Sequence, residues 1–343
     1  QAEDGIRDVE RSRGLGDVYK RQMKALLLVG GYATRLRPLS LDRPKCLFPV
    51  DNKPIIDYLI ENLAKANCTE VVLAVNNHAE KIKSYLGEEK HGIKLHYSQE
   101  DQPLGTGGPI KLATNYLQDE PFLVLNGDIL SWIDYAELMQ HHKENHATAT
   151  LTLKQVSDPT RYGVVRFGEN DSIQEFVEKP TREQAPSNWI NAGCYALNPE
   201  ILNTIPEGKV SIERQVFPKL AAQNKLKGYK YHGDWIDIGV PSDYLGADKL
   251  IRKTQASINP TCIIHPNATI TDSIIWGNTT IGPHTIITST IIGRNTMIGH
   301  HISIKNSVIA DNTIIDHNLI ITEATIYPNL HIETNIKNRE IKT

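Results

Sequence analysis

Residue types suited to phosphate binding follow one another near the start of the sequence. Gly30 and Gly31 lack a Cβ, so their backbone N–H groups can approach a bound anion closely. Thr34, Arg35 and Arg37 come directly after them and supply a hydroxyl and two cations. This order of residues indicates a binding site for a phosphorylated small molecule. A Gly-Gly pair alone is more often a plain turn, and the cations that follow favour the phosphate site.

A second cation and a carboxylate extend this predicted site. Pro38 and Pro44 stiffen the segment before Lys45, so its ammonium is expected at a fixed place. Asp128 follows the apolar run 122–125, where a carboxylate is poorly placed for a core and well placed for a hard cation. The alternative for Asp128 is a plain Asn-Gly-Asp turn.

The stretch VGGYATRLRPLSLDRPKCL, residues 29–47, resembles the signature of the sugar-1-phosphate nucleotidyltransferases (nucleotide-sugar pyrophosphorylases) and is most similar to that of mannose-1-phosphate guanylyltransferases. The resemblance implies that Arg35 and Lys45 are catalytic and that Gly30, Gly31 and Thr34 bind the nucleotide. Three positions depart from the family pattern: Ala33 replaces glycine, Ser40 replaces threonine and Cys46 replaces proline. If position 33 requires a positive φ, alanine costs about 1 kcal/mol there.

Later motifs extend the resemblance. The loop PLGTGG, residues 103–108, resembles the base-binding segment of the family, which implies that Glu100, Gly105 and Thr106 bind the nucleotide and that Glu100 accepts hydrogen bonds from guanine. A helix-entry turn with a solvated carboxylate is the alternative. The F-x-E-K-P and N-A-G runs, residues 176–180 and 191–193, imply a sugar-phosphate site of Gly163, Glu178, Lys179 and Asn191, although Glu178 and Lys179 alone could equally form a surface ion pair.

The run DWIDIG, residues 234–239, resembles the family's second metal motif and implies that Asp237 joins Asp128 in holding Mg²⁺, the expected cofactor. The resemblance implies transfer of a nucleotidyl group from a nucleoside triphosphate, GTP favoured, to a sugar 1-phosphate, mannose 1-phosphate favoured, with release of pyrophosphate. A glucose-1-phosphate thymidylyl- or uridylyltransferase is one alternative. A non-catalytic nucleotide-sugar-binding regulatory subunit is another, favoured by Ala33 and Cys46.

Strands and helices alternate over the part of the chain that must position these residues. Residues 26–29 form a continuous apolar run, as in a strand buried on both faces, and 55–63 carry isoleucine and leucine at helical spacing. Further strands are expected at 71–75, 94–98, 122–125, 148–153, 162–165 and 173–177, and helices at 79–86 and 135–145. The pattern predicts an α/β fold with a Rossmann-like, mostly parallel sheet that binds its ligand at the carboxyl ends of the strands.

From about residue 259 the pattern changes to a repeat. Isoleucines recur in steps of six, five and six residues, so that Ile264, Ile281, Ile298 and Ile315 are each 17 residues apart. Three short strands per coil, with isoleucine turned inward, predict a left-handed parallel β-helix of hexapeptide repeats, with small residues such as Gly282 at its corners. Acyltransferases also use this fold, but so short a tail favours an assembly or regulatory module and a homo-oligomer. The histidines of the tail and those on helix 135–145 are expected to be solvated.

Composition limits the other possibilities. The net charge of −3 argues against a nucleic-acid partner, and no apolar run is long enough to span a membrane. Four cysteines without metal-type spacing, with no readable signal peptide, favour the cytoplasm. Residues 1–22 read as a non-native, disordered leader. The expected domains are therefore 23–255, the nucleotidyltransferase domain, and 256–343, the β-helix.

Overall fold

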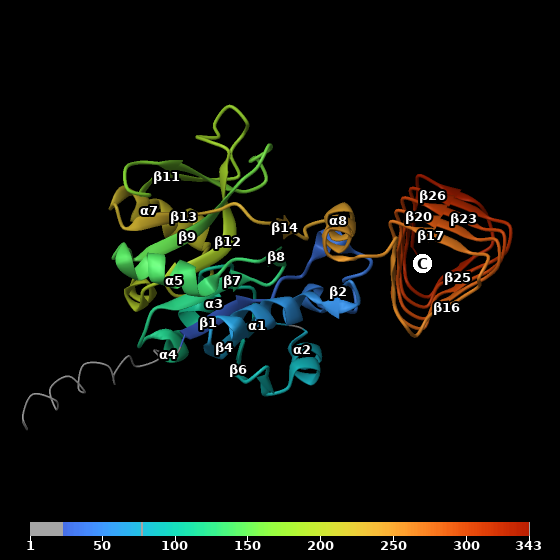
Figure 1. Cartoon of the computed structure of the whole chain (residues 1–343), viewed down its shortest axis with the longest axis horizontal. Helices are drawn as coiled ribbons and strands as arrows, with labels where there is room; N and C mark the ends of the chain where they lie inside the picture. The colour runs from blue at the N-terminus through green and yellow to red at the C-terminus, as the bar shows by residue number, and fades with distance from the viewer. Residues whose placement is uncertain (1–22, 77, 343) are drawn as a thin grey trace, which may run out of the picture.

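The computed structural model describes residues 23–76 and 78–342 of the chain. An α/β domain comes first, and helix α8 (Pro241–Ile251) leads from it to a parallel β-helix that begins with β15 (Ser257–Ile258) (Figure 1). The predicted leader, residues 1–22, lies outside the described residues. No helix of the described chain combines the length and the apolar character needed to cross a membrane.

A ten-stranded, mostly parallel sheet forms the centre of the first domain, as the alternating pattern predicted. Strand β1 (Met23–Leu28) lies between β4 (Cys68–Val75) and β7 (Phe122–Asn126) and is parallel to both. The carboxyl ends of these strands therefore meet at one edge. The other strands of the sheet are β5 (Glu89–Lys90), β6 (Ile93–Gln99), β9 (Ala149–Gln155), β10 (Gly163–Phe167), β11 (Ile173–Glu178), β12 (Trp189–Leu197) and β13 (Leu226–Tyr231).

Helices cover both faces of this sheet, so the central strands are buried on both sides. Leu27 packs in one apolar cluster and its neighbour Leu26 in the other, and neither has exposed surface. The helices are α1 (Ile55–Lys65), α2 (Ala79–Leu86), α3 (Gly108–Leu112), α4 (Thr114–Leu117), α5 (Tyr135–Glu144), α6 (Ile212–Gln215) and α7 (Phe217–Ala222), with 3₁₀ turns η1 (Thr34–Leu36), η2 (Lys45–Leu47) and η3 (Pro199–Asn203).

One histidine of α5 differs from the expectation of a solvated face. His142 is only 1% exposed, and its Nδ1 lies 2.8 Å from the Thr150 hydroxyl on β9. Burial lowers the pKa of His142 to about 4, so the ring is neutral at pH 7. The alternating threonines of β9 were interpreted as a half-buried strand, but Thr150 and Thr152 have no exposed surface because α5 covers that face. A neutral imidazole can pack there and share a hydrogen bond.

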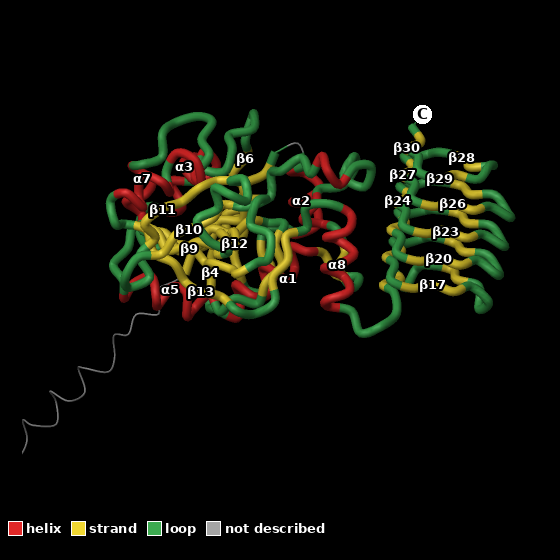
Figure 2. Tube along the Cα trace, turned by 90° about the horizontal axis from the view of Figure 1, so that it is seen from above, coloured by secondary structure: helices red, strands yellow, loops and turns green. Residues whose placement is uncertain are grey.

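The C-terminal repeat forms the predicted left-handed β-helix, in which three sheets of very short parallel strands stack coil upon coil (Figure 2). Ile264, Ile281, Ile298 and Ile315 pair in register, so the 17-residue period is one coil. The three sheets consist of strands β15, β18 (Ile274–Ile275), β21 (Ile291–Ile292), β24 (Val308–Ile309), β27 (Thr325–Ile326) and β30 (Glu340–Ile341); β16 (Ile263–Ile264), β19 (Thr280–Ile281), β22 (Met297–Ile298), β25 (Ile314–Ile315) and β28 (His331–Ile332); and β17 (Thr269–Thr271), β20 (Ile286–Thr288), β23 (Ser303–Lys305), β26 (Ile320–Thr322) and β29 (Ile336–Lys337).

The corners of the β-helix use asparagine and glycine for different reasons. Asn278, Asn295 and Asn312 adopt positive φ angles of 60°, 54° and 59°, and their side-chain amides hydrogen-bond to one another from coil to coil. Gly282 does not have a positive φ. A Cβ at Gly282 would lie 2.6 Å from the carbonyl oxygen of Gly299 in the next coil, so close stacking excludes a side chain there.

The two domains share an apolar junction. The sheet that contains β24, β27 and β30 faces the first domain (Figure 2). Trp276 of this sheet is buried against Phe48, with 5.2 Å between the ring centroids, and its Nε1 donates a hydrogen bond to the Tyr244 hydroxyl on α8. Tyr244 in turn donates to the carbonyl of Pro49 at 2.5 Å. Phe48 and Pro49 directly follow η2, so the β-helix supports the segment that carries Lys45.

Candidate functional site

The loop after β1 folds back over the end of the sheet. Gly30 brings the backbone against Glu100, so closely that a Cβ there would lie 3.2 Å from the Glu100 Oε1. Ala33 has φ 46° and ψ 42°, the left-handed conformation in which alanine costs about 1 kcal/mol. The carbonyl of Ala33 accepts hydrogen bonds from the Leu36 N–H and the Ser40 hydroxyl, which hold the turn in place. The backbone at position 33 therefore has a positive φ, the conformation that a glycine, as in the family pattern, adopts without strain.

Lys45 and Asp128, 83 residues apart, meet across this loop. The Lys45 Nζ lies 2.7 Å from the Asp128 Oδ2, and the lysine side chain is 11% exposed. Lys45 begins η2 behind Pro44, whose backbone is extended, while Asp128 stands just beyond the end of β7. The ammonium is therefore held beside the carboxylate at the edge where the parallel strands end.

Asp237 lies beside Asp128 because two short strands pair. Strand β14 (Trp235–Asp237) runs antiparallel to β8 (Ile129–Ser131), with Asp237 opposite Ile129, and the Ile238 N–H donates to the Asp128 carbonyl at 3.0 Å. Burial, together with the charge of Asp128, raises the pKa of Asp237 from 3.8 to about 6. Lys45 and Arg35 partly oppose this shift. Two carboxylates held together against their mutual repulsion, with oxygen as the only donor type, fit a hard divalent cation.

Arg35 lines the same cavities as Asp128, and its charge acts on Asp237. Its Nη2 lies 3.3 Å from the position that a Cβ on Gly239 would occupy, and the Nη2 of Arg161 lies 3.1 Å from the same position. Arg161 forms an ion pair of 3.0 Å with Asp243, whereas Arg35 forms no ion pair with any residue that the structure describes. A side chain at Gly239 would displace both guanidinium groups, which accounts for glycine two residues after Asp237.

Three adjoining cavities make up one cleft around Asp128. We name them the phosphate, base and sugar compartments after the ligands that the sequence resemblance leads us to expect. The phosphate compartment, of about 250 Å³, is lined by Gly31, Thr34, Arg35, Lys45 and Gly239. The base compartment, of about 310 Å³, is lined by Gly30, Glu100, Gly105 and Thr106, and the sugar compartment, of about 400 Å³, by Gly163, Glu178, Lys179, Asn191 and Asp237. Asp128 lines all three.

In the base compartment, Glu100 is 9% exposed and its Oε2 accepts the Leu104 N–H at 2.8 Å. Burial raises the pKa of Glu100. Gly105 has φ 79°, and a Cβ there would lie 2.4 Å from the carbonyl oxygen of Val210. The Thr106 hydroxyl donates to the Glu213 carboxylate at 2.5 Å and thereby ties this loop to α6. Glu100 Oε1 remains available to a ligand.

In the sugar compartment, Glu178 is partly buried, and burial followed by the charge of Glu213 raises its pKa. Lys179 has φ 51°, is 59% exposed, and lies 3.5 Å from the Glu178 Oε1. The Asn191 side chain is already engaged at both ends, because its amide donates to Tyr195 Oη and its oxygen accepts the Gly193 N–H. Asn191 can therefore contact a ligand only through its remaining hydrogen-bonding capacity.

The cleft also contains residues that the sequence did not single out as ligands. Arg161, Glu213 and Trp235 line the sugar compartment, together with Asn126, Tyr162, Tyr195 and Arg214. Glu213 belongs to the run SIER, residues 211–214, in which the Ser211 side chain caps α6. In the sequence this run indicates only the start of a helix, not that Glu213 lines the cleft. Arg161 stands next to the expected strand 162–165, and nothing in its neighbourhood in the sequence shows that it reaches Asp243.

The chain matches two protein-family models. Residues 24–254 match the nucleotidyl transferase model, and residues 246–342 match the model of the GMPPB C-terminal domain.

Curated relatives match over most of the chain. A probable mannose-1-phosphate guanylyltransferase 1 of Oryza sativa subsp. japonica is 43% identical over 266 residues, which cover 74% of this chain and 73% of that protein. A mannose-1-phosphate guanyltransferase of Yarrowia lipolytica is 43% identical over 249 residues, 71% of this chain and 68% of that protein.

Among solved structures, HddC from Yersinia pseudotuberculosis superposes with a TM-score of 0.59 at 29% identity, covering 67% of this chain and all of that one. A putative glucose-1-phosphate thymidylyltransferase from Bacillus anthracis has a TM-score of 0.63 at 24% identity, covering 68% of this chain and 96% of that one, and shows the shared fold. With its signature loop, its central cleft and these matches, the chain belongs to the nucleotidyl transferase family.

Proposed function

We propose that this protein is a mannose-1-phosphate guanylyltransferase, which joins GTP and mannose 1-phosphate to form GDP-mannose and pyrophosphate. The observation that carries the proposal is the convergence of Lys45, Arg35 and two carboxylates on one cleft of a chain that is 43% identical to proteins of that name. The cleft has separate compartments of suitable size for a base, a phosphate chain and a sugar.

The reaction needs no protein nucleophile. An oxygen of the sugar phosphate attacks the α-phosphorus of the nucleotide in line, a new P–O bond forms, and the bond to pyrophosphate breaks. Arg35 is free of ion pairs with described residues and can stabilise charge on the departing pyrophosphate. We assign Lys45 to the α-phosphate and the exposed Lys179 to the incoming sugar phosphate. Catalysis then consists of positioning and charge neutralisation.

Mg²⁺ is the cofactor that we propose, held by Asp128 and Asp237. Bound there, it would supply positive charge to the phosphate oxygens during transfer. The raised pKa of Asp237 supports this assignment, because a cation would relieve the repulsion that causes the shift. Until a cation binds, Lys45 compensates part of this negative charge.

Glu100 is the residue that we propose selects the base. Guanine offers its N1–H and amino group as donors, and the free Glu100 Oε1 beside Gly30 is an acceptor for them. The Glu100→Gln variant should therefore lose preference for GTP and still fold. A variant with the same preference among nucleotides as the native chain would remove Glu100 from this role.

The non-catalytic alternative rested on Ala33 and Cys46. Ala33 is accommodated in the left-handed conformation, and Cys46 is buried, with a pKa raised to about 12 by burial, so its thiol stays neutral. Neither departure removes a charged group from the cleft. These observations favour the enzyme over a regulatory subunit.

We also propose that the protein forms a homo-oligomer and works in the cytoplasm. Ile263, Met297 and Ile314 are 70%, 58% and 43% exposed and lie in one column along the outer face of the β-helix, with Thr280 between Ile263 and Met297. A second copy could cover this surface. All four cysteines are free, which suits a reducing compartment. Sedimentation of the native chain beside the Met297→Lys variant tests the oligomer.

The decisive experiment measures pyrophosphate release, coupled to inorganic pyrophosphatase, with four nucleoside triphosphates and several sugar 1-phosphates. We expect the highest kcat/KM for GTP with mannose 1-phosphate. Highest activity with UTP or dTTP and glucose 1-phosphate would favour the uridylyl- or thymidylyltransferase. No turnover with any pair, from a chain that still binds nucleotide sugar, would favour the regulatory subunit.

A further inference from the structure

A second cavity lies at the junction between the two domains, apart from the substrate cleft. Its volume is about 470 Å³. The first domain lines it with Arg43, Leu47 and Tyr85, and the corner of the first β-helix coils lines it with Trp276 and Arg294, among others. We call it the junction cavity. None of its lining residues lines the three compartments around Asp128.

The charged side chains that line the junction cavity are all positive. Its only charged lining residues are Arg43 and Arg294, and its other polar groups are uncharged amides and hydroxyls, those of Asn52, Asn259, Asn278, Asn295, Thr261 and Tyr85. The Arg43 guanidinium stacks over the Trp276 ring, 4.7 Å from its centroid, and is thereby fixed in place. Within the described residues, neither arginine forms an ion pair. Two guanidinium groups that line one cavity without an ion-paired carboxylate can bind an anion.

Three carboxylates border this site, those of Asp42, Glu80 and Asp311. Asp311, in an adjoining cavity of about 530 Å³ that shares both arginines, accepts the backbone N–H of Arg294 at 2.8 Å. Burial raises the pKa of Asp311, and the charge of Arg294 opposes this rise. Asp42 pairs with Lys81 at 2.5 Å, and Glu80 also lines the adjoining cavity. Among the described residues, none of these three acids forms an ion pair with Arg43 or Arg294.

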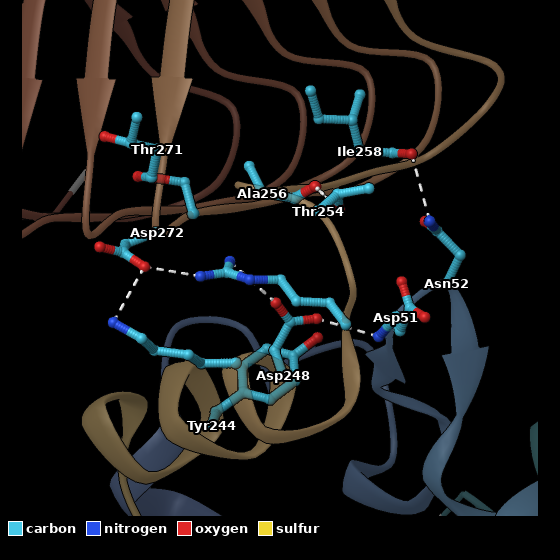
Figure 3. A network of polar contacts seen from close by, with 12 residues as sticks. Asp51, Asn52, Tyr244, Asp248, Thr254, Ala256, Ile258, Thr271 and Asp272 are labelled. Carbon is cyan, nitrogen blue, oxygen red and sulfur yellow. Dashed lines mark hydrogen bonds and ion pairs between the residues drawn. The ribbon is translucent and has the colours of Figure 1, made fainter.

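The walls of the junction cavity are held at a fixed separation by polar contacts between the domains (Figure 3). Asp248 of α8 accepts the Asp51 N–H at 2.9 Å and pairs with Arg252, which also bonds Asp272 of the β-helix at 2.6 Å. The Asn52 amide, itself in the cavity wall, donates to the Ile258 carbonyl at 3.2 Å. The site is thus preorganised, and the binding of an anion would cost little free energy for ordering its walls.

We propose that the junction cavity binds a small phosphorylated anion, clamped between Arg43 of the first domain and Arg294 of the β-helix. Guanidinium groups match phosphate oxygens in planar, two-point contacts, and the side chains of Leu47 and Tyr85 can face the organic part of such a ligand. Arg43 precedes the Lys45 of the substrate cleft by two residues, with the buried Pro44 between them. The ligand would therefore adjoin the segment that carries this lysine.

Inorganic pyrophosphate, without divalent cations, is the probe. Isothermal titration calorimetry on the full chain should detect binding that survives in the Arg35→Ala variant, which weakens the substrate cleft. Adding Arg294→Gln to this variant should weaken the remaining binding about tenfold or more, since one charge-assisted pair is lost. Arg339→Gln, at an exposed arginine of the same domain that lines none of these cavities, is the matched control and should bind as its parent does.

Binding that is equal in the parent and in the Arg294→Gln and Arg43→Gln derivatives would overturn the proposal. So would a complete loss of binding in the Arg35→Ala chain, because all the pyrophosphate would then occupy the substrate cleft. Neither result depends on turnover, so a failure of the proposed enzymatic function would leave this test intact.

Discussion

Replacing Asp237 by asparagine tests the central carboxylate pair. The pKa of Asp237 is raised from 3.8 to about 6, by burial first and the charge of Asp128 second. A raised pKa means that the ionised form is disfavoured in the folded state. Above pH 6 the ionised carboxylate lowers the free energy of unfolding by about 3 kcal/mol. This loss disappears as the pH falls from 6 towards 4, because the carboxyl is then protonated in the folded state. Asparagine keeps the shape and removes the charge, so Asp237→Asn should stabilise the protein at alkaline pH.

Thermal unfolding in EDTA at two pH values measures this effect. At pH 8 we expect the midpoint of the first domain to rise by about 6 °C, since 1 kcal/mol corresponds to about 2 °C for a domain of this size. At pH 5 the gain should be about half as large, because the native carboxyl is then mostly protonated in the folded state. Asp234→Asn, three residues earlier and exposed, is the control and should change neither midpoint.

Addition of Mg²⁺ should reverse the order of stability. The stability of the native chain should rise with the logarithm of the Mg²⁺ concentration above the dissociation constant, and Asp237→Asn should gain little, because one ligand is missing. The variant should also be inactive. If it were no more stable than the native chain at pH 8, or more stable by the same amount at both pH values, repulsion between buried carboxylates would not be the property that shapes this site.

Three further substitutions test other parts of the molecule. Arg35→Ala should lower turnover about 10²–10³-fold with an unchanged unfolding midpoint, whereas Arg37→Ala, at an exposed residue outside the three compartments, should keep its activity; equal losses would refute the assignment. Ala33→Gly should stabilise the chain by about 0.5–1 kcal/mol through relief of the left-handed alanine, and calorimetry showing a lower midpoint would contradict this. Trp276→Ala should cost about 3–5 kcal/mol and make the junction sensitive to limited proteolysis, while Ile286→Ala, at an exposed position, should do neither.

Local patterns predicted most of the architecture. The continuous apolar run at 26–29 marked a strand buried on both faces, and the 17-residue spacing of isoleucines marked one coil of the β-helix, because burial and backbone period leave direct traces in residue order. The same patterns mistook His142 for a solvated residue, since its burial depends on the contact between α5 and β9, which lies outside its local period.

The amino-acid sequence by itself determined which side chains could handle phosphate and where strands end, because glycines, prolines and apolar runs act on neighbouring residues. Only the tertiary structure decided that Lys45 and Asp128 lie 2.7 Å apart, that the pairing of β8 with β14 puts Asp237 beside Asp128, and that Arg43 and Arg294 face one cavity. These contacts are between residues that lie far apart in the sequence. They depend on how the sheets and the two domains pack, which local patterns of residues do not show.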